Sequence, residues 1–236
     1  MANKHPAVSL SDRGLNESAK TLRANIDFAG IDAPIRSVAI TSAEKGDGKT
    51  IIACMLAIAE ATADRKTLIV DNDFRNPQVS ARLNVHGTHK LSELLNATEE
   101  TFMDFCMPTK VPNLYVLDVG LRRSDPVEVL SSQKYDRILD LAKSLFDFVV
   151  IDTPPLGLFI DAAIVAPKTD GTLIVVRSGK DTPQSLQSVM SQLEKANARV
   201  LGAVLNGANV RNTSYYYYYY YSSKEHKAKR RSHNRH

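Results

Sequence analysis

The chain has 236 residues, 43% of them hydrophobic and 24% charged, which is typical of one globular domain with short tails. The formal net charge is +4, but residues 222–236 hold six Lys or Arg and one Glu, so this end carries +5 and the remainder −1. A slightly acidic body excludes nucleic-acid binding through a basic surface, and no apolar run is long enough to span a bilayer.

Two further features of the sequence bear on the cellular compartment. The first residues, MANKHPAVSLSDRG, lack the apolar stretch of a signal peptide. Cys54 and Cys106 have neither metal-ligand nor CxxC spacing, which favours a reducing cytoplasm. We therefore expect a cytoplasmic protein that reaches a membrane only through something else.

Short β-branched runs alternate with helical stretches. The predicted strands are 36–42, 67–73, 113–120, 146–152, 171–178 and 199–206, and the predicted helices are 49–64, 89–97, 125–144, 159–166 and 182–197. Thr182 and Pro183 are a suitable N-cap and first residue for the last helix. Near-continuous apolar strands are typical of parallel strands covered on both faces. The order predicts an α/β, doubly wound, mostly parallel sheet that binds ligands at the carboxyl ends of its strands.

This pattern also predicts the domain organisation. Residues 12–210 are expected to form one domain with the fold of P-loop NTPases. Residues 1–11 are expected to be a flexible N-terminus, and residues 211–236 a disordered tail that holds a tyrosine cluster and the basic stretch.

The first predicted strand runs directly into AEKGDGKT at residues 43–50, which fits the A/G-x-x-x-x-G-K-S/T form of a phosphate-binding loop, the Walker A motif. Gly46 and Gly48 let backbone N–H groups turn towards phosphate oxygens, and the following helix directs its N-terminus at the anion. Lys49 suits the β- and γ-phosphates, and Thr50 suits Mg²⁺. The predicted nucleotide-binding stretch is Glu44, Lys45, Gly46, Asp47, Gly48, Lys49, Thr50 and Ile51.

Two further motifs place acids at strand ends, as Walker A′ and Walker B motifs do. TLIVDNDFR, at 67–75, contains Asp71 and Asp73, which point the same way on an extended chain. FDFVVIDTPP, at 146–155, ends its strand at Asp152. A single Asp is more often a helix cap or turn residue. Three acids beside a phosphate-binding loop instead favour a Mg²⁺ site and a general base.

Tyrosine is concentrated at one place near the end of the chain. Seven of the nine tyrosines stand consecutively at 215–221, directly before the basic stretch, and the other two are Tyr115 and Tyr135. Such a run is prone to β-aggregation, and the basic stretch would then act as a solubilising gatekeeper. The alternative is that the tyrosines are functional.

The loop AEKGDGKT, the motifs LIVDNDFR and FVVIDTPP, and the tyrosine cluster together resemble the bacterial tyrosine kinase family, the cytoplasmic kinases of capsule and exopolysaccharide synthesis. The resemblance covers roughly residues 12–221. It implies ATP with Mg²⁺ as the phosphate donor and a tyrosine hydroxyl as the acceptor. In this family the tyrosine cluster is the autophosphorylation site, and transfer in trans onto a neighbouring copy is expected.

The resemblance also implies roles for single residues. By position, Lys49 would hold the phosphates, while Thr50, Asp73 and Asp152 would hold Mg²⁺ directly or through water. Asp71 is the candidate base near the attacking tyrosine. The residues themselves do not separate Asp71 from Asp73 in these roles.

The partners are implied in the same way. They are a membrane activator or chain-length protein with a cytoplasmic segment that recruits the kinase to the inner face of the plasma membrane, further copies of the chain in a ring, and a cognate tyrosine phosphatase. LNESAKTLRANIDF resembles the ring-forming element E-x-x-R-x-x-R through Glu17, Lys20 and Arg23, although Lys20 replaces an arginine. A helix with solvent-facing charges is the alternative. In GLRRSDPVEVL, Arg122 and Arg123 stand where the family has proline.

Two other functions fit the same motifs. Partition and septum-placement ATPases share the expected fold, but they carry a signature lysine five positions before the loop lysine, where this chain has Glu44, and they lack a tyrosine-rich tail. A non-catalytic adaptor switched by nucleotide binding remains the second alternative.

Overall fold

The computed structural model describes residues 13–87, 91–118 and 126–208. The predicted flexible N-terminus, the stretch with Arg122 and Arg123, and the tyrosine cluster with its basic tail lie outside the described residues. The chain forms two compact units, and the first ends at Asn206. All the helices and strands described below belong to this first unit.

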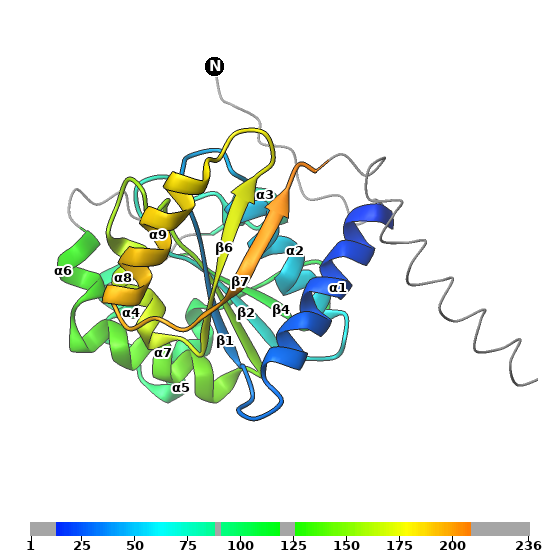
Figure 1. Ribbon diagram of the computed structural model, residues 1–236. Helices are drawn as coiled ribbons and strands as arrows, with labels where there is room; N and C mark the ends of the chain where they lie inside the picture. Colours follow the sequence, from blue (N-terminus) through cyan, green and yellow to red (C-terminus); the bar gives the residue numbers. More distant parts are fainter. Residues whose placement is uncertain (1–12, 88–90, 119–125, 209–236) are drawn as a thin grey trace, which may run out of the picture. The chain divides into compact units, whose positions relative to one another are not determined.

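A single sheet organises this unit (Figure 1). Its order is β3-β4-β2-β5-β1-β6-β7, and all neighbours are parallel except β3 and β4. The strands are β1 Ser37–Ser42, β2 Thr67–Asp71, β3 Met107–Pro108, β4 Leu114–Asp118, β5 Phe148–Asp152, β6 Gly171–Arg177 and β7 Val200–Asn206. The mostly parallel, doubly wound fold is confirmed. All six predicted strands are present, and the short edge strand β3 was not predicted.

Helices cover the sheet between the strands. They are α1 Arg13–Ala29, α2 Lys49–Ala61, α3 Val79–Leu83, α4 Leu91–Leu94, α5 Glu99–Phe102, α6 Pro126–Leu130, α7 Gln133–Leu145, α8 Asp161–Val165 and α9 Pro183–Lys195. Short 3₁₀ turns are η1 Met103–Phe105 and η2 Ala166–Lys168. The predicted start of α9 is confirmed, because the Thr182 side chain accepts a hydrogen bond from the Ser185 N–H and Pro183 follows.

The prediction of one helix over 125–144 was wrong, since α6 and α7 are separate. The Ser132 hydroxyl explains the break. It donates to the Val129 carbonyl at 2.7 Å, which closes α6, and it accepts from the Tyr135 N–H at 3.2 Å, which caps α7. A serine side chain thus replaces the backbone bonds that a continuous helix would need at this point.

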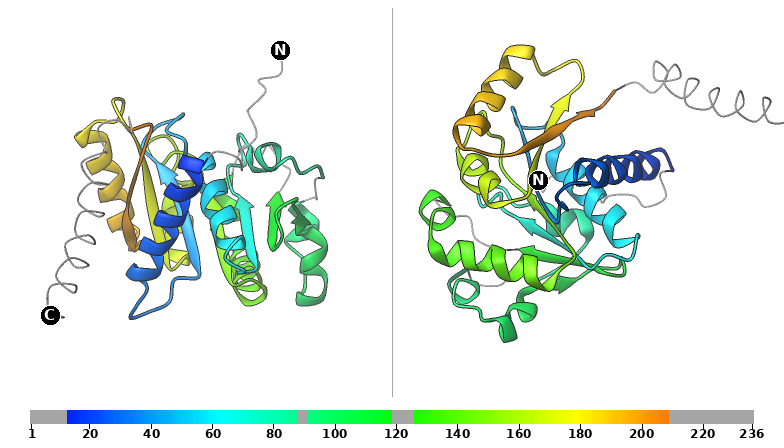
Figure 2. Two further views of the ribbon diagram at one scale, coloured as in Figure 1. Left: turned by 90° about the vertical axis from the view of Figure 1, so that its right-hand side faces the viewer. Right: turned by 60° about the horizontal axis from the view of Figure 1, so that its bottom comes forward.

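Alternation along the strands sends side chains to two different faces. In β5, Phe148 and Val150 pack in the core beneath α1 and α2, whereas Val149 and Ile151 pack against α7 on the other face. Figures 1 and 2 show α1 and α2 on one side of the sheet and α7, α8 and α9 on the other. Both faces of β5 are therefore buried, as its apolar sequence predicts.

Helix α1 packs on α2, and its Ile26 joins the core cluster that also holds Phe148 and Val150 of the sheet. Ala19 of α1 contacts Met55 and Ala59 of α2 in a small apolar cluster. Glu17 and Lys20 lie on the outer side, 61% exposed, and pair with each other at 2.8 Å. Within the described residues, no helix has the length and apolar character needed to cross a bilayer.

Candidate functional site

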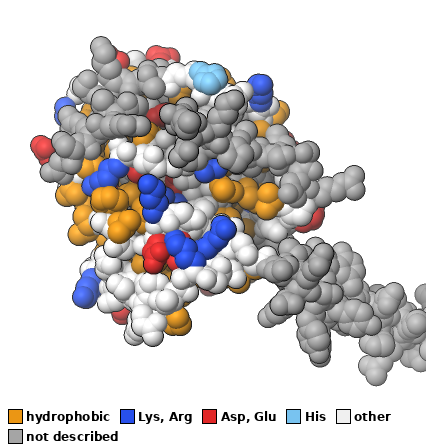
Figure 3. All heavy atoms as spheres, turned by 90° about the horizontal axis from the view of Figure 1, so that it is seen from above, with side chains coloured by type: hydrophobic (Ala, Val, Ile, Leu, Met, Phe, Trp, Pro, Cys, Tyr) orange, Lys and Arg blue, Asp and Glu red, His pale blue; other side chains and the backbone are white. Residues whose placement is uncertain are grey.

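A cavity of about 650 Å³ lies where β1, β2, β5 and β6 end. Its lining residues come from the ends of these strands and the segments that follow them: Lys45, Gly46, Gly48, Lys49, Thr50, Ile51, Asp73, Arg75, Asn76, Gln78, Arg82, Pro155, Leu158, Phe159 and Arg177. Lys and Arg side chains gather with hydrophobic ones on the face seen in Figure 3, towards which β6 and β7 point in Figure 1. The volume is within the range of sites for nucleotide-sized ligands.

The loop of residues 43–50 connects β1 to α2, as the motif requires. Gly46 and Gly48 have φ values of 89° and 97°, in the left-handed region that favours glycine. A Cβ on Gly48 would also lie 2.1 Å from the Asn206 amide nitrogen. Lys49 and Thr50 are the first residues of α2, so the N-terminus of a 13-residue helix borders the cavity. This arrangement of N–H groups and helix dipole suits a phosphate.

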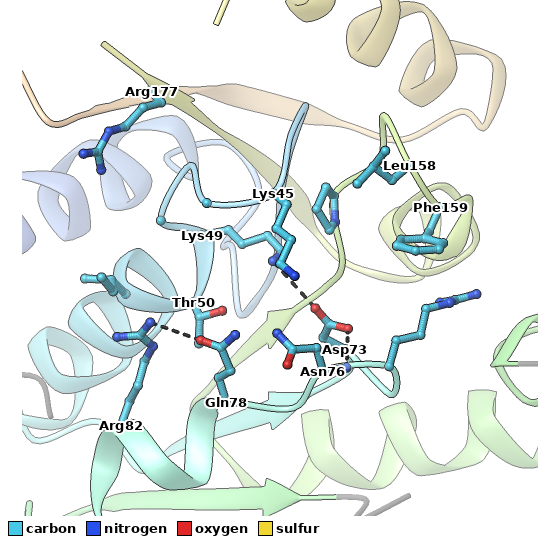
Figure 4. Close-up of a pocket in the computed structure, with 15 residues that line it drawn as sticks. Lys45, Lys49, Thr50, Asp73, Asn76, Gln78, Arg82, Leu158, Phe159 and Arg177 are labelled. Carbon is cyan, nitrogen blue, oxygen red and sulfur yellow. Dashed lines mark hydrogen bonds and ion pairs between the residues drawn. The ribbon is translucent and has the colours of Figure 1, made fainter. Parts of the chain in front are cut away.

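Lys49 and Asp73 approach each other across the cavity (Figure 4). The Lys49 ammonium lies 3.7 Å from an Asp73 carboxylate oxygen, and both side chains are nearly buried. The other Asp73 oxygen accepts from the Asn76 N–H at 3.0 Å, which holds the turn after β2. A cation and an acid thus face the same space, where phosphates and a metal ion would meet.

The parallel register brings the strand-end acids together. Asp71 is the direct neighbour of Asp152 on β5 and of Asp118 on β4, which corresponds to a strand spacing of about 4.8 Å. Asp71 accepts from the Gln78 and Val79 N–H groups, both at 2.8 Å, and so fixes the start of α3. The strand ends at Asp71, so Asp73 does not continue its alternation.

Asp152 is fully buried, and neither of its carboxylate oxygens has a hydrogen-bond partner among the described residues. Burial raises its pKa to about 6, although the positive charge of Lys49 and the nearby Thr50 hydroxyl act in the opposite direction. Burial and the nearby Asp152 likewise raise the pKa of Asp71 well above its usual range. Two adjacent buried acids, one without partners, are an arrangement that a divalent cation would stabilise. The donor set therefore fits Mg²⁺.

The segment that follows β5 forms another wall of the cavity. Arg75 pairs with the buried Asp161, and its guanidinium stacks 4.2 Å from the Phe159 ring centroid. Gly157 allows this segment to approach the phosphate-binding loop, because a Cβ there would lie 2.2 Å from the Ala43 carbonyl oxygen. Leu158 is 59% exposed.

The structure brings most of the predicted nucleotide-binding stretch together with Asp73 in the cavity. The predicted residues Glu44, Asp47, Asp71 and Asp152 do not line it. Asp71 and Asp152 are buried at the adjoining edge of the sheet, while Glu44 and Asp47 contact Lys180 outside it. Tyr135 is buried and donates its hydroxyl to Asn72 at 2.9 Å, so it is no accessible acceptor.

Several residues at the site were not singled out from the sequence. Among them are Phe159, Arg177, Lys180 and Asn206. The rule that ligands bind beyond the carboxyl ends of parallel strands pointed to Arg177 and Asn206, which end β6 and β7. No local pattern distinguishes Lys180 or Phe159.

Residues 35–204 match a family described as an AAA domain. Tyrosine-protein kinase CpsD of Streptococcus agalactiae is 33% identical over 215 residues, which cover 88% of this chain and 93% of that protein. The kinase domain of the Escherichia coli tyrosine kinase ETK superposes with a TM-score of 0.78 at 28% identity, over 88% of this chain and 82% of that one. The septum site-determining protein MinD of Pyrococcus horikoshii, solved with Mg-ADP, gives a TM-score of 0.61 at 26% identity, over 75% and 72%.

Proposed function

This chain belongs to the family of bacterial tyrosine-protein kinases, and from that premise we propose that it transfers the γ-phosphoryl group of ATP to the tyrosines at 215–221 of a neighbouring copy. The observation that carries this proposal is the meeting of Lys49 and Asp73 in a cavity at the start of α2, beside the unpartnered Asp152. The P-loop fold of the AAA domain binds nucleotide, and ATP is the donor this site suits.

The residues divide the work of binding. The N–H groups at Gly46 and Gly48 and the start of α2 surround the phosphates, and Lys49 adds a positive charge. Thr50, Asp73 and Asp152 would hold Mg²⁺. When bound, that ion would neutralise phosphate charge during transfer.

Asp71 is the proposed base for the tyrosine hydroxyl, with Asp73 as the alternative. Its place at the end of β2, directly beside Asp152, supports the assignment, because a carboxylate at this edge of the sheet can accept the proton of a phenol with a pKa of about 10. The N–H groups of Gln78 and Val79 orient its carboxylate. Asp73 lines the cavity directly, which supports the alternative.

Phosphorylation would act on assembly through charge. Each phosphotyrosine adds about −1.5 to −2 charges, so a few would overturn the +5 of residues 222–236. Repulsion between modified tails would loosen a ring formed through the Glu17, Lys20 and Arg23 face of α1. If this account holds, phosphorylation-driven disassembly weakens at high salt, and insensitivity to salt contradicts it.

The cellular role we propose is control of capsule or exopolysaccharide synthesis and export. The kinase would be cytoplasmic, recruited to the inner face of the plasma membrane by an activating membrane protein with a cytoplasmic segment, and reversed by a cognate tyrosine phosphatase. Membership of the kinase family supports this role.

The test is mass spectrometry of the full chain after incubation with ATP and Mg²⁺, with and without the activator's cytoplasmic segment. We expect phosphate on the tyrosines at 215–221 and none in Lys49→Met. ATP binding without phosphotyrosine, even with the activator present, would favour the nucleotide-switched adaptor. Mixing Lys49→Met with an active chain whose seven tyrosines are replaced by Phe tests transfer in trans, since phosphate should then appear on the Lys49→Met chain.

A further inference from the structure

Asp47 is an unusual component of a loop that binds anions. It lies between Gly46 and Gly48 and is fully buried. A buried carboxylate opposes the approach of phosphate unless its charge is compensated. One of its oxygens accepts from the Glu44 N–H at 2.7 Å, and this bond alone leaves the charge in place.

The compensating cation is Lys180, from the turn between β6 and α9. Its ammonium lies 2.6 Å from the other Asp47 oxygen and 3.2 Å from a Glu44 carboxylate oxygen. It also donates to the Lys45 carbonyl at 2.8 Å. The hydrogen bond to Asp47 raises the pKa of Lys180, which keeps the ammonium charged. All three ammonium protons thus have acceptors on the loop.

These contacts also orient the loop backbone. Within a trans peptide unit the C=O and N–H groups point in opposite directions. Lys180 holds the Lys45 carbonyl, so the Gly46 N–H is directed away from Lys180. The Asn206 side chain orients the N–H of Gly48 in the same way, because it donates to the Asp47 carbonyl at 2.7 Å. Gly46 and Gly48 line the cavity, whereas Lys180 does not.

We infer that Lys180 is a positioning residue for nucleotide binding: it neutralises Asp47 and fixes the Lys45 carbonyl, so that the loop offers its N–H groups to phosphate without a competing negative charge. The inference rests on the nucleotide-binding part of the proposed function and is independent of tyrosine transfer.

The experiment is titration of the full chain with a fluorescent ADP analogue and Mg²⁺. Lys180→Met should weaken binding by about tenfold or more, because it leaves a buried charged acceptor unpaired. Lys180→Arg should retain most of the affinity. Lys195→Met, which removes an exposed lysine at the end of α9, is the matched control and should bind normally.

Asp47→Asn makes the test specific to the charge. On this background Lys180→Met should cost less than about threefold, because no buried carboxylate then needs compensation. The double variant also provides a binding measurement if Lys180→Met alone is poorly folded. Unchanged affinity in Lys180→Met, or an equal loss on both backgrounds, would overturn the inference while nucleotide binding by the wild type stands. A wild-type chain that binds no nucleotide would overturn the proposed function as well.

Discussion

Buried charged groups lie at both ends of helix α2, but their interactions differ between the two ends. At its start, Lys49 and Thr50 border the cavity, and the nearby Asp152 has no hydrogen-bond partner among the described residues. At its end, the fully buried Glu60 pairs with Arg65 at 2.9 Å. That guanidinium stacks 4.6 Å from the Phe148 ring centroid.

The difference shows how function and stability are separated along one helix. A buried carboxylate without partners destabilises the ligand-free protein, so it is best explained by a ligand that arrives later. A buried carboxylate held by a stacked guanidinium belongs to the scaffold. Changes at the start of α2 should therefore alter activity more than stability, and changes at its end should do the reverse.

The largest expected effect is that of Asp152→Asn. Phosphotransfer should fall by about 100- to 1,000-fold, because a preorganised charge at the phosphate site is lost. The melting temperature of the ligand-free chain should stay the same or rise, because an unpartnered buried charge is removed. Quantitative phosphotyrosine mass spectrometry and calorimetry measure the two effects. A large loss of stability would mean that Asp152 belongs to the scaffold.

Asp71→Asn and Asp73→Asn separate the roles of two acids in one motif. If Asp71 is the base, its variant should lower kcat by about 100-fold with little change in nucleotide affinity. Asp73→Asn should instead act mainly on nucleotide affinity, because it removes the partner of Lys49. Single-turnover rates and nucleotide titrations of both variants provide the comparison. The reversed pattern would assign the base to Asp73.

At the other end of α2, Arg65→Met should lower the free energy of unfolding by about 2 to 3 kcal/mol. It leaves Glu60 unpaired and removes the stacking on Phe148, and the effect is reduced because 26% of the Arg65 side chain is exposed. Urea denaturation measures the change. Phosphotransfer per folded molecule should be unaffected, and Arg65→Lys, which keeps the charge, should cost less.

Glu60→Gln should give a smaller effect that depends on pH. Burial raises the pKa of Glu60 to about 7, with Asp27 adding to the shift and Arg65 and Arg23 opposing it. The ionised form is therefore disfavoured in the folded state, a penalty that is full above pH 7 and disappears as the pH falls towards the unfolded pKa. The variant should be more stable than wild type, and this difference in the free energy of unfolding should grow by about 2 kcal/mol from pH 5 to pH 8. A difference independent of pH would contradict this.

The last test concerns the close approach of Gly157 to the phosphate-binding loop. Gly157→Ala would place a Cβ against the Ala43 carbonyl, so the segment after β5 must shift. We expect a loss of about 1 to 3 kcal/mol in stability, with weaker nucleotide binding because this segment forms one wall of the cavity. Gly179→Ala is a useful contrast, since its φ of 73° strains the backbone but no atom lies within 4 Å of the added Cβ.

Much of the fold and of the loop was predictable because the signals are local. A β-branched run followed by A-x-x-x-x-G-K-T determines a strand, a turn and a helix start within about 15 residues, and the described structure has all three at 37–61. The short elements β3, α3 and α5 were missed because two to five residues carry too little periodicity. The break between α6 and α7 was missed because a serine such as Ser132 is equally compatible with an exposed position in a continuous helix.

The sequence by itself determined the six longer strands and their order along the chain, the loop with Lys49 and Thr50, and the acids that end β2 and β5. These depend on neighbours in the chain, through backbone conformation and the alternation of side chains. Only the tertiary structure decided which acid is left unpartnered, that Lys180 compensates Asp47, and that Arg75 joins Asp161 and Phe159 in one wall. Such contacts join residues far apart in the chain, and only the packing of the turns and helices around the sheet brings them together.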